Sequence, residues 1–287
     1  MASLAGRCDG LPLWVRVLDE LCAWDRILHY RYRNGTRFWA YALRSRLMMW
    51  LIAFTGVRGD ELIRLQLTGP QSQLVRDPRG RVRALTFPRT AIRRPARTVP
   101  LTALPALATM LELYVDRARP LLLGTRQDTG GQLILDALGK PYVPRRWADG
   151  YGRLRRQIFG SHARITQWDL RRMAFLALHF GFRRPFFEAS RIVGSTPARL
   201  FRNSEHFGRY GVGNVSLLAS DTMVLPREID RVIDGVRRWL SEVERDLEAI
   251  RGSSVERPAI DRPARFVEFC RNKHRAAPTA SRRSRRA

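Results

Sequence analysis

One short segment, FTGVRGDEL at 54–62, places an arginine where an anion could be bound. Arg58 comes two residues after Gly56, between an apolar run at 47–54 and an acidic pair that starts at Asp60. The guanidinium group is planar and can hold two phosphate oxygens at once, so Arg58 is a candidate phosphate ligand. A simpler explanation is that Thr-Gly ends one helix, Asp60 caps the next, and Arg58 lies on the surface.

A second group of arginines follows in the segment from 72 to 102. This segment alternates apolar and polar residues between turns, which predicts a small antiparallel sheet or a pair of hairpins. Residues 78–102 contain no acid, whereas arginines occur at positions 79, 81, 83, 89, 93, 94 and 97. Exposed hairpins usually mix the two signs of charge, so this one is expected to face phosphates. The alternative is an arginine-rich surface without a special role.

The charge of the whole chain favours a polyanionic partner. Its 287 residues include 52 Lys and Arg but only 26 Asp and Glu, a formal charge of +26. Such a charge predicts attraction to nucleic acid first and to anionic membranes second. Apolar residues make up 45% of the chain, enough to bury a substantial core.

The cysteines and the apolar runs indicate the compartment. Cys8, Cys22 and Cys270 are scattered, their number is odd, and they form no metal-binding spacing with the histidines. We therefore expect a reducing compartment and no metal or other cofactor. No signal peptide is apparent, and the longest apolar run is too short to span a bilayer. An intracellular protein without a membrane partner is expected.

The hydrophobic periodicity predicts an α+β fold, mostly α-helical, with a small antiparallel sheet on one side. The expected helices lie within 11–55, from 61 to 66, 104–117, 151–159, 169–180 and 226–251. The expected division is a short N-terminal helical segment at 1–45, a main domain at 46–220, a C-terminal helix at 221–252 and a basic, partly disordered tail at 253–287.

The helix at 226–251 allows two interpretations. Its apolar residues recur every three or four positions, as in Ile229, Val232, Val236 and Trp239. This stripe could pack on the helix's own domain. It could also bind a protein partner or a second copy of the chain.

Four segments, taken in order, resemble one family. T-G-x-R-x-x-E-L at 55–62 is followed by a basic hairpin that ends in V-P-L at 99–101. Then come x-x-L-R at 168–171 and I-x-G at 192–194. This order resembles the catalytic domain of the tyrosine recombinase (phage integrase) family over residues 40–215.

The resemblance implies a phosphate site built from arginines. Arg58 and Arg171 match the two arginines that bind the scissile phosphate in this family. The transition state at that phosphate carries extra negative charge, which the two guanidinium groups would stabilise without a metal. Glu61 would support Arg58 from one turn away, unless it is an ordinary acid at a helix start. Neighbouring phosphates or DNA are expected to contact Arg93, Arg94, Arg97, Arg172 and Ser195.

Three positions depart from the family pattern. The family places a lysine in the hairpin, where this chain offers only Arg89, Arg93 and Arg94, which release protons poorly. Trp168 replaces a histidine or lysine and cannot transfer a proton. Ser195 replaces a histidine but still carries a hydrogen-bond donor.

The nucleophile is also displaced from its usual spacing. The nearest tyrosine is Tyr210, which an insertion could bring into place. His206, four residues earlier, could then supply proton transfer. Alternatively, Tyr210 is a core or loop residue and His206 a surface histidine.

Three functions remain open. The resemblance implies a double-stranded DNA partner and metal-independent strand cleavage and rejoining through a phosphotyrosine link. The departures instead favour a weakened, architectural DNA-binding protein of the same type. A third possibility is an unrelated basic nucleic-acid-binding protein. The expected location is with DNA, in the nucleus of a eukaryotic or viral host or in the prokaryotic cytoplasm.

Overall fold

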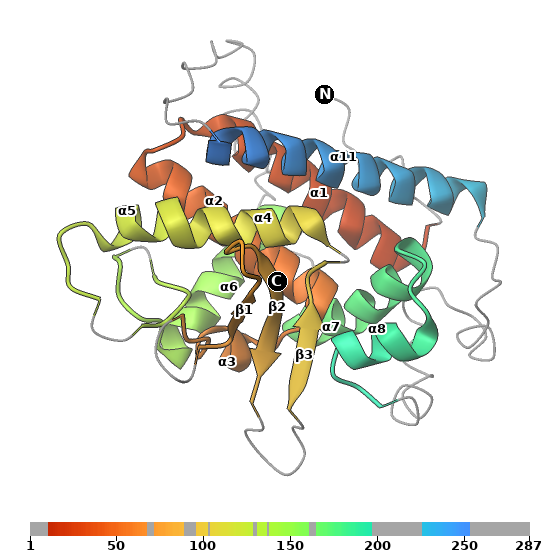
Figure 1. Ribbon diagram of the computed structural model, residues 1–287. Helices are drawn as coiled ribbons and strands as arrows, with labels where there is room; N and C mark the ends of the chain where they lie inside the picture. Colours follow the sequence, from red (N-terminus) through yellow and green to blue (C-terminus); the bar gives the residue numbers. More distant parts are fainter. Residues whose placement is uncertain are drawn as a thin grey trace, which may run out of the picture.

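The fold is mostly helical, with one small sheet at its edge (Figure 1). The computed structural model describes residues 11–67, 72–88, 96–102, 104–128, 131–136, 138–160, 165–196 and 226–252. This architecture confirms the α+β expectation with a small antiparallel sheet.

Two long helices form the centre of the core. Helix α1 (Leu13–Arg31) leads through a turn to α2 (Arg37–Thr55). The Thr36 side chain caps α2 by accepting a hydrogen bond from the backbone N–H of Trp39 at 3.1 Å. Gly56 ends α2 in the left-handed conformation, with φ 59°. The expected boundary between 45 and 46 therefore lies inside α2, and α1 belongs to the same hydrophobic core as the rest.

The sheet has the strand order β1-β2-β3 and is antiparallel throughout. Its strands are β1 (Leu74–Arg76), β2 (Val82–Phe87) and β3 (Arg97–Pro100). Leu85 pairs with Leu74 on one side and with Val99 on the other. Leu85 and Val99 are fully buried, so the sheet packs one face on the helices.

Shorter helices complete the described part of the fold. They are α3 (Gly59–Leu62), α4 (Pro105–Leu113), η2 (Tyr114–Ala118), α5 (Arg119–Leu123), α6 (Pro144–Phe159), α7 (Gln167–Leu176), η3 (Ala177–Gly181) and α8 (Phe186–Ile192). The expectation of a helix at 61–66 was wrong, because α3 ends at Leu62. Gln66 instead forms a β-bridge with Gln132, and its backbone N–H binds the Gln73 side chain.

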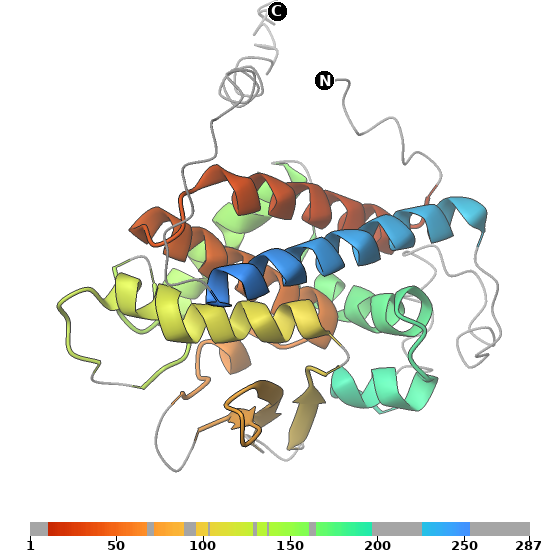
Figure 2. The ribbon, with the colours of Figure 1, turned by 45° about the horizontal axis from the view of Figure 1, so that its top comes forward.

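Helix α11 (Arg227–Gly252) lies across α1 and α4 (Figure 2). Its apolar stripe is buried in this domain, and Trp239 and Val243 are almost fully covered. The structure therefore favours the interpretation in which the helix packs on its own domain. The stripe that we considered for a partner or a second copy is already occupied.

A buried aspartate fixes α11 to the two central helices. Asp25 is 0% exposed and accepts hydrogen bonds from Arg46 and from the indoles of Trp50 and Trp239 at 2.7–2.9 Å. His29 extends this network, with Nδ1 2.8 Å from Arg46 and Nε2 2.9 Å from Asp246 of α11. These directional contacts join α1, α2 and α11 in one arrangement.

The described helices were also compared with the length that a bilayer requires. Within the described ranges, none combines enough residues with enough apolar character to cross a membrane.

Candidate phosphate-binding site

The loop between α2 and α3 places Arg58 and Glu61 side by side. Arg58 has extended backbone angles and precedes the first residue of α3. Its backbone N–H donates to Oε2 of Glu61 at 2.8 Å, the hydrogen bond that an acid at the third helical position commonly makes. Glu61 therefore has the ordinary helix-start role that we considered. Its other contacts add a second role.

Arg97 reaches the same carboxylate from β3. Its Nη2 donates to Oε2 of Glu61 at 2.9 Å, and its Nη1 donates to the carbonyl of Val193 at 2.7 Å. The side chain is only 6% exposed and lies over the ring of Phe87. Burial lowers the pKa of Arg97, the charge of Arg58 adds to this effect, and Glu61 opposes it.

Arg171, on α7, is the third arginine near Glu61 and lies next to the end of α2. Its Nη1 donates to the Gly56 carbonyl at 3.0 Å. Its Nη2 donates to the carbonyls of Val193 at 2.8 Å and of Gly194 at 3.2 Å. Nη1 also lies 4.0 Å from Oε2 of Glu61. The structure thus brings the Arg58 backbone N–H and the Arg171 guanidinium to one carboxylate, and Arg171 joins the end of α2 to the turn after α8.

Two glycines make this close approach possible. Gly56 has φ 59°, and a Cβ there would lie 3.1 Å from Cβ of Val193 and 3.2 Å from Cγ of Arg171. Gly194 has φ 63°, and a Cβ there would lie 2.3 Å from Nη1 of Arg97. Both positions therefore require glycine for backbone conformation and for space.

The charges around Glu61 do not balance. The guanidinium groups of Arg97 and Arg171 contact protein groups, namely Glu61 and backbone carbonyls. Among the described residues, no carboxylate pairs with the Arg58 guanidinium, and its Nε is buried without a hydrogen-bond partner. The guanidinium groups of Arg97 and Arg171 thus share one carboxylate, and the charge of Arg58 acts on Arg97. An anionic oxygen would offset the excess positive charge.

Trp168 lies with its ring beside the Arg58 guanidinium. Its side chain, at the start of α7, is 56% exposed, and the Arg58 guanidinium carbon lies 5.8 Å from its ring. This distance is within the range of a cation–π contact. Trp168 can therefore interact with the arginine through its ring but cannot transfer a proton.

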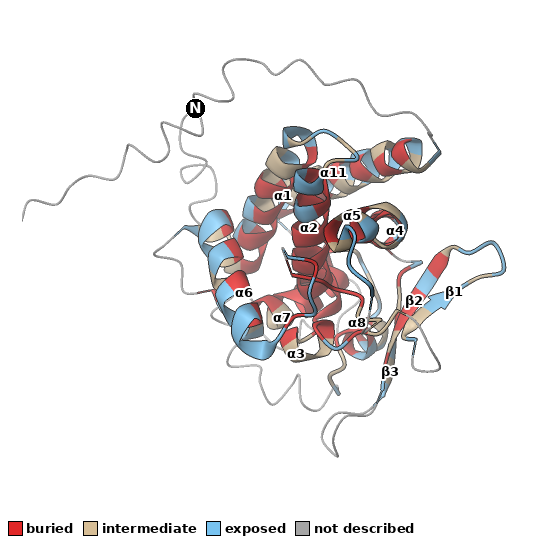
Figure 3. Ribbon diagram, turned by 90° about the vertical axis from the view of Figure 1, so that its left-hand side faces the viewer, coloured by how far each residue is buried: buried red, intermediate tan, exposed pale blue. Residues whose placement is uncertain are grey.

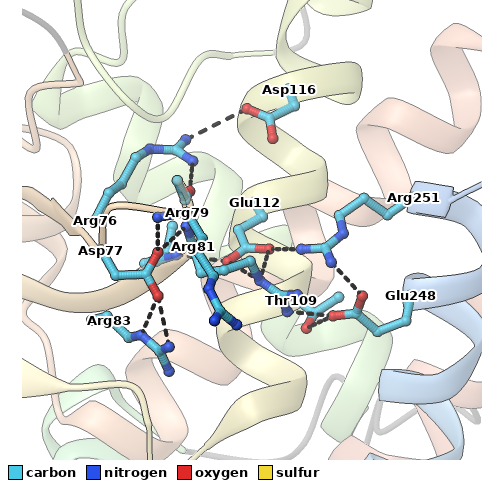
Figure 4. A network of polar contacts seen from close by, with 12 residues as sticks. Arg76, Asp77, Arg79, Arg81, Arg83, Thr109, Glu112, Asp116, Glu248 and Arg251 are labelled. Carbon is cyan, nitrogen blue, oxygen red and sulfur yellow. Dashed lines mark hydrogen bonds and ion pairs between the residues drawn. The ribbon is translucent and has the colours of Figure 1, made fainter.

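The hairpin does not present only positive charge. Arg83 pairs with Asp77, and Arg81 pairs with Glu112 of α4 and Glu248 of α11 (Figure 4). Arg251 contacts both glutamates at 2.5–2.7 Å. The expectation of a phosphate-facing hairpin is therefore wrong for Arg81 and Arg83, because acids of α4 and α11 neutralise Arg81 and Asp77 of the same hairpin pairs with Arg83.

The remaining candidates fall into two groups. Arg172 is partly buried on α7, and no described contact joins it to Glu61. Ser195 follows Gly194, and its backbone N–H and carbonyl both bond to Ser190 of α8. The others lie outside the described residues: Arg89, Arg93, Arg94, His206 and Tyr210.

Helix α6 is a neighbour of the site that the sequence analysis missed. It begins at Pro144, well before the expected start at 151, and Trp147 packs so closely that a Cβ at Gly59 would lie 2.0 Å from its Nε1. Its outer face is exposed (Figure 3) and carries four exposed arginines, Arg145, Arg146, Arg153 and Arg156. The expected helix at 151–159 is part of α6, and the stripe of Trp147, Tyr151, Leu154 and Ile158 could have revealed its earlier start.

The chain was compared with known proteins and searched for metal-binding groups. No family model matches it, and neither does any curated protein or solved structure. Within the described ranges, no three or more His, Cys, Asp or Glu residues are grouped so as to hold a metal ion.

Proposed function

We propose that this chain is a double-stranded DNA-binding protein of the tyrosine recombinase type that holds a backbone phosphate at Arg58. The observation that carries the proposal is the Arg58 guanidinium, whose Nε is buried without a hydrogen-bond partner and whose charge acts on Arg97, while Arg97 and Arg171 share the Glu61 carboxylate. Arg58 has no acidic partner in the described part of the chain, so its guanidinium is the group that a phosphate would engage.

The other two arginines act as positioning residues in this proposal. Arg97 and Arg171 bond to backbone carbonyls and to Glu61, which keeps positive charge near Arg58 without exposing it. The charges of Arg97 and Arg171 would attract a phosphate bound to Arg58, and the partly buried, low-dielectric environment would screen this attraction only weakly. The exposed Arg145, Arg153 and Arg156 of α6, the helix beside Gly59, extend the positive surface along which DNA could lie, whereas Arg146 pairs with Asp136.

The activity that we propose for this site is strand cleavage and rejoining. The Tyr210 oxygen would attack the phosphorus, the bond to the 5′ oxygen would break, and that oxygen would leave with a proton as a hydroxyl. The product is a 3′-phosphotyrosyl link. A 5′ hydroxyl would attack this link and restore a phosphodiester, releasing the tyrosine, so no metal or nucleotide is consumed.

A second function, DNA binding without strand transfer, is favoured by a specific observation. The carbonyl contacts of Arg171 hold its guanidinium between Gly56 and 193–194, and Trp168 occupies the place of a proton-transferring side chain. Such a site could bind and organise DNA while lacking an acid for the leaving oxygen.

A nicked duplex that traps the covalent product separates these functions. The protein is incubated with the duplex, and adducts that survive SDS are resolved by electrophoresis. Strand transfer predicts an adduct that disappears in Tyr210→Phe and persists in Tyr30→Phe, a change at an exposed tyrosine on α1. Tight duplex binding without an adduct would assign the architectural function. Failure to bind duplex DNA would overturn both.

A further inference from the structure

The turn between α1 and α2 displays aromatic rings that are exposed to solvent. Phe38 is 72% exposed, and Tyr41, one turn later on the same helix, is 39% exposed. The ring of Tyr32, at the end of α1, stacks on Phe38 with centroids 6.0 Å apart and an angle of 17° between the planes. Large apolar rings that project together from a surface commonly mark an interaction site.

The same turn is positively charged. Residues 26–59 contain no acid. The Arg31 guanidinium lies 5.2 Å from the centre of the Tyr32 ring, and Arg33 and Arg37 are exposed beside it. The surface therefore combines arginines, which can contact phosphates, with π faces on which bases can stack.

This surface is far from the cluster around Glu61. The turn lies at the start of α2 and Arg58 follows its end, and the 19 residues of α2 span about 28 Å. Figure 1 shows α2 running between the α1–α2 turn and α3. The aromatic surface is therefore a separate place on the protein from the Glu61 cluster.

We propose that Tyr32, Phe38 and Tyr41, with Arg31, Arg33 and Arg37, bind single-stranded nucleic acid. The rings stack on unpaired bases and the arginines contact the backbone phosphates. A duplex cannot use these rings, because its base faces are already covered by their neighbours. The preference for single strands is thus a consequence of the aromatic component, and the arginines alone would bind either form.

Photo-crosslinking locates the bound strand directly. The full-length protein is irradiated with a 12-nucleotide oligonucleotide that contains 5-iodouridine, digested with trypsin and analysed by mass spectrometry. The proposal predicts a crosslink in the peptide at 38–44, which contains Phe38 and Tyr41. A crosslink in the peptide at 32–33, which contains Tyr32, would also support it, and crosslinks found only outside 32–33 and 38–44 would overturn it.

Affinity measurements with matched variants test the stacking. Phe38→Ala should weaken binding of single strands about fivefold or more, since one base stack contributes about 1–3 kcal/mol. Phe38→Tyr should retain the affinity. The control is Phe187→Ala on α8, because Phe187 is equally exposed at 75% and lies outside the surface. Equal losses for the two alanine variants, or no loss for Phe38→Ala, would contradict the proposal.

Two further readouts keep the result interpretable. If Phe38→Ala lowers the unfolding temperature, the double change Arg31→Gln and Arg37→Gln replaces it. That variant should reduce the slope of log affinity against log salt by about 1.4 for single strands; an unchanged slope would contradict the proposal. Arg58→Gln should leave the crosslink at 38–44 intact, so this surface and the Glu61 cluster can fail independently.

Discussion

The carboxylate of Glu61 lies 2.9 Å from Nη2 of Arg97, although the two residues come from α3 and β3 and are 36 positions apart. Both side chains are largely buried. The same oxygen accepts the Arg58 backbone N–H at 2.8 Å. Glu61 therefore couples the loop that carries Arg58 to the sheet, and the position of Arg58 depends on this contact.

Removal of that carboxylate charge should destabilise the fold. Glu61→Gln leaves the buried Arg97 guanidinium without its counter-charge, and we expect the free energy of unfolding to fall by about 3 kcal/mol. Urea denaturation of the parent protein and of the variant measures this difference in the free energy of unfolding. Arg83→Gln is the control, since it breaks an exposed pair with Asp77 and should cost less than about 1 kcal/mol. Similar losses for both variants would mean that the Glu61 pair is not energetically distinct.

Gly194 should tolerate alanine poorly. Gly194→Ala combines a strained backbone with a Cβ 2.3 Å from Nη1 of Arg97, so we expect a loss of about 2–4 kcal/mol. Gly80→Ala has the same sign of φ but nothing within 4 Å, and should cost only about 1–2 kcal/mol. Thermal unfolding compares the two, and equal losses would show that contact with Arg97 adds nothing to backbone strain.

The free energy of unfolding should decrease as the pH is lowered, because His29 is buried in its neutral form. Burial and the charge of Arg46 lower its pKa from 6.5 to about 4, so the folded state keeps it neutral while the unfolded state takes up a proton. Its contribution is complete above about pH 6.5 and is lost as the pH falls toward 4, up to about 3 kcal/mol. Denaturation of His29→Gln across this range should show a smaller pH dependence than the parent. Parallel curves would contradict this assignment.

Trp168 should help to orient Arg58. Trp168→Ala removes the ring 5.8 Å from the guanidinium, and exposed cation–π contacts contribute about 0.5–1 kcal/mol, so duplex affinity should fall about two- to fivefold. Trp168→Phe keeps a π face and should lose less. Fluorescence anisotropy with a labelled duplex measures both, and an equal loss in the two variants would count against a role for the ring.

Local patterns predicted much of the helical framework. Apolar periodicity located α1, α2, α7 and α11, and the alternation in 72–102 located the sheet. The sequence also pointed to Arg58 and Arg171 in order along the chain. These features are visible because each depends on residues a few positions apart.

Long-range pairing was not predictable in the same way. Arg81 pairs with Glu248, 167 positions later, and Arg97 turns inward to Glu61, so neither presents the positive surface that composition suggested. The end of α3 at Leu62 depends on a bridge from Gln66 to a distant segment. Tertiary contacts overrode the local pattern at these positions.

The most direct test of the phosphate site is duplex binding by Arg58→Gln at several salt concentrations. Arg238→Gln serves as the control, because Arg238 is exposed on α11, away from α3 (Figure 1). We predict that Arg58→Gln binds at least about tenfold more weakly and lowers the salt slope by about 1, as expected for one lost phosphate contact. Affinity and slope equal to those of Arg238→Gln would contradict the proposal that Arg58 holds a phosphate.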